Sequence, residues 1–219
     1  MNTFLIDFFV NAFESIAGFV LILAIFMFPV RTYLIPTIFA AIVMAQTSYL
    51  AREVLNLDSI TPLLMLGWII VVIWMLFRVH IFYALLMAVT GYVCYGAMQL
   101  ILIFLCQFFI DLDTLTTGFN QLKVIQIITS TVSMIIAIIF IKKRIGFSFV
   151  PDRKTEKVTY IGVNRILLYV LIGASLIIAA VSYFVHDGKF SFLLYIFSFI
   201  LVILIVLYLA IWKERRDID

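Results

Sequence analysis

Long apolar segments alternate with short polar connections along the whole chain. A helix needs about 20 predominantly apolar residues to cross the hydrocarbon core of a bilayer. Seven segments approach or exceed this length, at residues 4–28, 33–54, 60–77, 80–109, 120–141, 161–185 and 190–212. The pattern predicts an all-α polytopic membrane protein with seven transmembrane helices that form a single domain over residues 1–219.

The composition agrees with lipid as the main solvent. Hydrophobic residues make up 66% of the 219 residues and charged residues 12%, and the mean hydropathy is +1.24. A soluble domain is roughly 45–50% apolar and about 25% charged. The N-terminus lacks the basic region of a cleavable signal peptide, so we expect the first segment to stay as a membrane anchor. The expected location is the plasma membrane, with the lipid bilayer as the first partner.

Basic residues are distributed unevenly among the connections. If the N-terminus is outside, twelve of the fifteen Lys and Arg residues lie on the cytoplasmic side, and the other three are Arg52, Lys123 and Lys189. Cytoplasmic loops carry an excess of Lys and Arg, so we expect the N-terminus outside and the C-terminus in the cytoplasm. The long basic loop 142–160 either contacts anionic lipid or a cytoplasmic partner, or acts only as a topology determinant.

The stretch DFFVNAFESIAG near the N-terminus places two carboxylates and an amide in an apolar segment. Asp7, Asn11 and Glu14 are spaced by four and three residues and therefore share one helical face. An uncompensated charge at the centre of a membrane costs about 2.5–3.5 kcal/mol. Glu14 therefore needs a cationic partner, with Lys123 the first choice by depth and Arg52 the second. Asp7 is expected at the external interface, in contact with water.

The other predicted helices also carry their polar residues mainly in their outer halves. Polar side chains inside a membrane face one another or water. These groups therefore either hydrogen-bond the helices together or line a crevice that opens to the exterior. The candidate ligand-binding residues of the crevice are Glu14, Asn11, Gln46, Arg52, Tyr95, Gln99, Lys123 and Gln126.

The sequence contains no signature of catalysis, metal binding or nucleic-acid binding. His80 and Cys94 are the residue types of a base and a thiol nucleophile, but fourteen residues separate them, which is about 20 Å along one helix. HExxH, GxSxG and glycine-rich phosphate motifs are absent from the sequence, and the basic residues form no basic face. We expect no enzyme activity, no catalytic or metal site, no cofactor and no nucleic-acid partner.

Several segments are similar to a known family. MAQTSYLAREVLNL, VTGYVCYGAMQ and KKRIGFSFVPDR, together with a last helix that runs into WKERRDID, resemble the membrane sensor half of Agr-type peptide-sensing histidine kinases of Gram-positive bacteria. The resemblance extends over essentially the whole chain. It implies a bacterial quorum-sensing protein that detects an extracellular peptide and relays a change through the last helix. The sequence has no phosphoacceptor or ATP-binding region, so we expect no kinase activity of it.

Our leading hypothesis is a receptor-like sensor that binds an extracellular peptide or small ligand and signals to a cytoplasmic partner. The alternative is a small-solute transporter or a membrane accessory subunit, and a purely structural protein comes third. Each of these functions is compatible with a homodimer. A receptor should be closed on the cytoplasmic side, with a last helix that continues past Trp212. A transporter should have polar groups at the membrane midplane and a path to both faces.

Overall fold

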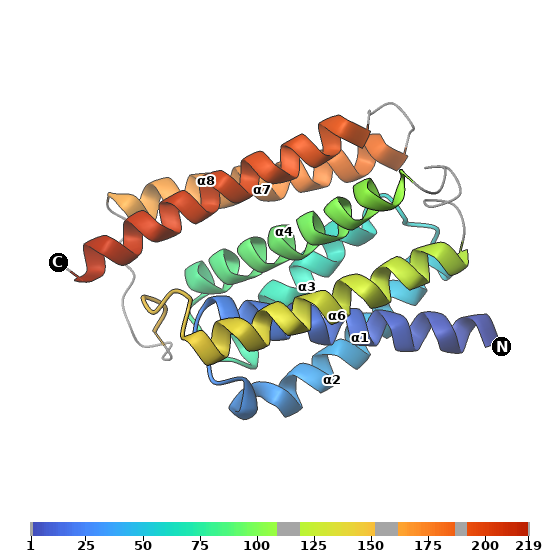
Figure 1. Cartoon of the computed structure of the whole chain (residues 1–219), viewed down its shortest axis with the longest axis horizontal. Coiled ribbons are helices and arrows are strands. Elements are labelled where there is room, and N and C mark those ends of the chain that lie inside the picture. Colours follow the sequence, from blue (N-terminus) through green and yellow to red (C-terminus); the bar gives the residue numbers. More distant parts are fainter. Residues whose placement is uncertain (1, 109–118, 152–161, 187–191, 219) are drawn as a thin grey trace.

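The computed structural model describes residues 2–108, 119–151, 162–186 and 192–218 (Figure 1). Nearly all of these residues are helical, and no strand occurs among them. The predicted all-α class is confirmed. The predicted basic loop 142–160 lies partly outside the described residues, and its first two residues continue the preceding helix.

The helices follow the apolar segments of the sequence. Their bounds are α1 (Asn2–Ile25), α2 (Val30–Tyr49), the π-helical turn η1 (Leu50–Val54), α3 (Thr61–Met75), α4 (Ile81–Cys106), α6 (Phe119–Lys143), α7 (Val163–His186) and α8 (Phe192–Ile218). Six of the predicted segments correspond to one helix each, the segment 33–54 comprises α2 and η1, and the ends differ by a few residues. The largest difference is at α8, which continues well past the predicted end at Trp212.

Six of the described helices are long and apolar enough to cross a membrane, and α3 is the exception. With fifteen residues, α3 is about 22 Å long, which is shorter than the hydrocarbon core of about 30 Å. The chain has the helices of a multi-pass membrane protein, and one predicted span is a shorter apolar helix. The helices run back and forth between two ends of the bundle, so the N- and C-termini lie at opposite ends (Figure 1).

A short hairpin around Arg78 and His80 joins α3 to α4. Arg78 adopts a left-handed backbone conformation with φ of 56°, which turns the chain. The Nδ1 atom of His80 accepts a hydrogen bond from the backbone N–H of Phe82 at 3.2 Å, and so caps the first turn of α4. His80 thus has a structural role at the start of a helix.

Helix α1 is the centre of the packing. It contacts α2, α4 and α6 and is the most deeply buried of the six long helices. Phe19, Leu21, Ile22, Leu23 and Phe26 are each at most 2% exposed. Since α1 is surrounded largely by protein, its polar side chains can find protein partners in place of lipid.

Two glycines allow neighbouring side chains to approach the backbone of α4 closely. A Cβ atom built on Gly91 would overlap Cγ1 of Ile22 in α1, and one built on Gly96 would lie 2.7 Å from Cε1 of Phe199 in α8. Small residues permit such approach where membrane helices cross. These two contacts position α4 between α1 and α8.

The segment after α6 joins the end of α1 to α8. The backbone N–H of Phe147 donates a hydrogen bond to the carbonyl of Ile25 at 2.8 Å. Glu214 of α8 accepts hydrogen bonds from the backbone N–H groups of Ser148 (3.0 Å) and Phe149 (3.3 Å), and from the Ser148 hydroxyl (2.6 Å). We call these five residues the C-terminal clasp.

Replacing Gly91 by alanine is expected to destabilise the protein. The added methyl group overlaps Cγ1 of Ile22 and lies close to its Cβ, so either the buried Ile22 side chain must change its conformation or α1 and α4 must move apart. Overpacking of this kind costs about 1–3 kcal/mol. Denaturant or thermal unfolding of the purified protein in nanodiscs would measure the loss.

The matched control is Gly173→Ala in α7, where a built Cβ has no neighbour within 4 Å. This variant should be neutral or slightly stabilising, because glycine inside a helix costs about 0.5–1 kcal/mol relative to alanine. Equal stability of the two variants would contradict the close packing of α1 on α4.

Candidate functional site

A polar face of α1 meets a polar face of α6. The amino group of Lys123 forms an ion pair with Asp7 and donates a hydrogen bond to Oδ1 of Asn11 at 3.4 Å. The Nδ2 group of Asn11 donates to Asp7 at 3.0 Å. One turn further along, Nε2 of Gln126 donates to the carboxylate of Glu14 at 2.9 Å. We call these five residues the polar ladder.

The ladder changes two expectations about partners. Asp7, which was expected to contact only water at the interface, is paired with the buried Lys123. Lys123 was expected opposite Glu14. The register of the two helices explains the difference. Lys123 and Gln126 are less than one turn apart, so when Gln126 lies beside Glu14, Lys123 lies at the level of Asn11 and Asp7.

The carboxylate of Glu14 has acceptor sites beyond the one that Gln126 uses, because a carboxylate offers about four. Arg52, the second choice from sequence, lines the same cavity as Glu14, whereas Lys123, the first choice, is paired with Asp7. The Oε1 atom of Gln126 is buried and has no hydrogen-bond partner among the described residues.

Tyr95 ties α4 to the same level of the ladder. Its hydroxyl oxygen lies 2.9 Å from Oγ of Ser130, and the Ser130 hydroxyl donates to the carbonyl of Gln126 at 2.7 Å. Tyr95 also interacts with the carboxylate of Glu14. Hydrogen bonds thus connect α1 to α6 at Glu14 and α6 to α4 at Ser130.

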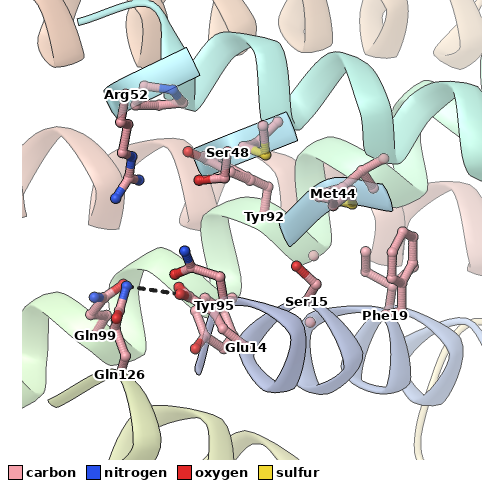
Figure 2. Close-up of a pocket in the computed structure, with 17 residues that line it drawn as sticks. Glu14, Ser15, Phe19, Met44, Ser48, Arg52, Tyr92, Tyr95, Gln99 and Gln126 are labelled. Carbon is pink, nitrogen blue, oxygen red and sulfur yellow. Dashed lines mark hydrogen bonds between the residues drawn. The ribbon is translucent and has the colours of Figure 1, made fainter. Parts of the chain in front are cut away.

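A cavity of about 220 Å³ lies beside Glu14, with walls from α1, α2, η1, α3, α4 and α6 (Figure 2). Arg52 is exposed and marks its rim. The apolar part of the wall includes Phe19, Met44 and Met65. The structure brings together six of the eight predicted candidates in this wall, namely Asn11, Glu14, Arg52, Tyr95, Gln99 and Gln126.

The other two candidates lie elsewhere. Gln46 is exposed on the outer surface of α2, because it is two residues, or about 200° of helical rotation, from Ser48, which does line the cavity. Lys123 is enclosed in the polar ladder, where Asp7 and Asn11 occupy its amino group. Contrary to the prediction, neither residue lines the cavity.

Three polar residues of the wall were not among the predicted candidates: Ser15, Ser48 and Tyr92. Spacing was a usable signal for Ser48, because it lies four residues after Met44 and four before Arg52. The π-helical turn around Arg52 then widens the helix, with a bond from the N–H of Leu55 to the carbonyl of Leu50 at 3.0 Å. Such turns are often found at functional sites.

A second cavity of about 230 Å³ adjoins the first. It shares Glu14, Tyr95 and Gln99 with the first cavity and is also lined by Phe199. Because Phe199 belongs to α8, the last helix of the chain contributes to a space that begins at Glu14.

The chemistry of the site is recognition by charge and hydrogen bonding. Within the described part of the chain, no three His, Cys, Asp or Glu side chains come together to hold a metal ion. The two cavities instead combine a carboxylate, a guanidinium, amides and hydroxyls with an apolar wall. Small-molecule sites typically have this mixture of an apolar lining and a few placed polar groups.

Comparison of the chain with protein-family models, curated proteins and solved structures gives no match. The polar ladder and the two cavities are therefore the basis for assigning a function.

Lys123 is expected to be coupled more strongly to Asp7 than to Glu14. Removing one partner of a buried ion pair costs about 3–5 kcal/mol, and residues in direct contact have interaction energies of about 0.5–3 kcal/mol. Two double-mutant cycles on the free energy of unfolding, with Lys123→Gln combined with Asp7→Asn or Glu14→Gln, would measure both couplings.

The control for these cycles is Lys142→Gln, which removes an exposed lysine at the other end of the same helix. This variant should change the free energy of unfolding by no more than about 0.5 kcal/mol. A larger coupling of Lys123 to Glu14 than to Asp7 would refute the register of α6 against α1.

Proposed function

We propose that the chain is a receptor-like membrane module that binds an extracellular peptide or small ligand beside Glu14 and signals through α8. The observation that carries this proposal is the pair of adjoining cavities, which connects the charged groups of Glu14 and Arg52 to Phe199 of α8. In this proposal the rim at Arg52 faces the exterior and the C-terminus faces the cytoplasm, in agreement with the distribution of Lys and Arg. The receiver is a cytoplasmic partner, as the resemblance to Agr-type sensors implies.

The packing beyond the first cavity supports a receptor over a small-solute transporter. Ile22 lies at the wall of the cavity, and beyond it Leu23, Phe26, Phe77 and Met87 are each at most 2% exposed. Interiors packed in this way contain few voids larger than a water molecule. A transporter needs a path to both faces of the membrane, and this apolar core obstructs it.

Helix α8 offers a route from the ligand to the opposite end of the bundle. Phe199 lines the second cavity and packs against Gly96. Further along, Lys213 donates a hydrogen bond to Oδ1 of Asn164 in α7 at 2.9 Å, and Glu214 belongs to the C-terminal clasp. A ligand shifts this helix only if it binds one arrangement more tightly than another. Contact with Phe199 would supply that difference.

The proposed orientation predicts opposite accessibility of two engineered cysteines. With Cys94 and Cys106 replaced by alanine, Asp58→Cys, an exposed position before α3, should react with a membrane-impermeant maleimide on intact cells. Asp217→Cys, near the end of α8, should react only after permeabilisation. The reverse pattern would place the rim of the cavity in the cytoplasm and would contradict an extracellular ligand.

Binding is expected to move α8. A fluorophore on Asp217→Cys should change its emission when a panel of short peptides and amino acids is added to the protein in nanodiscs. Gly18→Leu should abolish the response, because Gly18 lines the cavity and a built Cβ there has no neighbour within 4 Å. The larger side chain therefore fills the space that the ligand needs.

The variant Phe199→Ala should retain binding and weaken the fluorescence response, since it removes the contact of α8 with the second cavity. The matched control is Phe197→Ala, a change on the exposed side of the same helix. It should leave ligand binding and the fluorescence response unchanged. If no member of the panel changes the melting temperature or the emission, the receptor proposal fails.

A further inference from the structure

We propose that the first cavity binds a small zwitterion with an apolar side chain, of the class of the free α-amino acids. This inference rests on the proposed function, because it names the ligand of the same cavity. In the part of the chain that the structure describes, one side of the cavity has hydrogen-bond acceptors with unused sites. The other side has the guanidinium of Arg52, and apolar side chains line the space between them.

The side formed by α1 and α6 presents hydrogen-bond acceptors. Glu14 uses one acceptor site for Nε2 of Gln126 at 2.9 Å, and further sites remain. The Oε1 atom of Gln126 is buried without a partner among the described residues. The amide cannot be flipped to relieve this, because Oε1 would then face the carboxylate. A ligand ammonium has three donors and satisfies both groups.

The opposite side presents a cation. Within the described ranges, Arg52 forms no ion pair or hydrogen bond. In Figure 2 its side chain extends from the η1 side of the cavity toward Gln99 and Glu14. A guanidinium binds a carboxylate through two parallel hydrogen bonds, so the carboxylate of the ligand belongs at Arg52.

The charges around the cavity disfavour other simple ligands. Asp7 and Lys123 neutralise each other in the polar ladder, which leaves Glu14 and Arg52 as opposite charges in the cavity wall. A ligand with a single charge would meet a like charge at one of these residues, which weakens binding. A neutral ligand would offer no charged partner to either residue. A zwitterion offsets both charges.

The size of the cavity and its apolar wall restrict the rest of the ligand. The volume of about 220 Å³ is below the range of about 300–1,000 Å³ for sites that hold drug-sized ligands. A folded or cyclic peptide therefore exceeds it. Phe19, Met44, Met65 and Ile69 line the space, and methionine side chains adapt to the shape of a partner. These residues favour a branched aliphatic or aromatic side chain.

Calorimetric titration of the full chain in nanodiscs tests the two charges separately. The probes are L-leucine, L-leucinamide, which lacks the carboxylate, and N-acetyl-L-leucine, which lacks the ammonium, with the same three forms of L-phenylalanine. The free amino acid should bind at least about tenfold more tightly than either blocked form, because each blocked form leaves a charged group of the protein unpaired.

Two variants assign each charge to its residue. Arg52→Gln should reduce the preference for leucine over leucinamide, and Glu14→Gln should reduce the preference for leucine over N-acetyl-leucine. Gln46→Ala, an exposed change on α2, is the control and should keep both preferences. Melting temperatures of the ligand-free variants would establish that each one is folded.

The outcomes separate this inference from the proposed function. If neither amino acid binds, or if the blocked forms bind equally well, the zwitterion is ruled out as the ligand. A peptide response that Gly18→Leu abolishes, without binding of amino acids, would overturn the ligand class and retain the receptor. If no peptide or amino acid moves the fluorophore on α8, both proposals are overturned.

Discussion

A charge left unpaired in hydrocarbon costs free energy, and this constraint determines how α1 is held in the bundle. Asp7, Asn11 and Glu14 lie on one face of α1, and α6 supplies Lys123 and Gln126 opposite them. The polar ladder therefore specifies which face of α1 meets α6 and at which register. The apolar residues that follow on α1 then form the centre of the core.

The ladder is balanced at Asp7 and incomplete at Glu14. Asp7, Asn11 and Lys123 satisfy one another, whereas Glu14 accepts a hydrogen bond from Gln126, whose Oε1 atom is unpaired in the described part of the chain. The cavity begins where the ladder is incomplete. Incomplete polar pairing in a buried place destabilises a protein, and a ligand that completes the pairing would offset this cost.

The same packing connects the cavity to the opposite end of the molecule by two helices. Helix α1 passes from Glu14 in the cavity wall to Ile25 in the C-terminal clasp, and α8 passes from Phe199 to Glu214 in the same clasp. A change in the distance between α1 and α8 at the cavity would therefore act on the clasp as well. This connection gives the proposed signal a physical path through packed elements that have defined contacts.

The sequence by itself determined the all-helical class, the approximate helix bounds and the polar face of α1, because segment length and residue spacing are local properties. It also identified six of the residues that line the cavity. The tertiary structure decided the partners: Lys123 pairs with Asp7, and Ser48 lines the cavity in place of Gln46. These choices depend on how far α6 is displaced along α1 and how α2 is rotated about its axis. Both are set by packing between segments distant in sequence, which spacing within one segment does not encode.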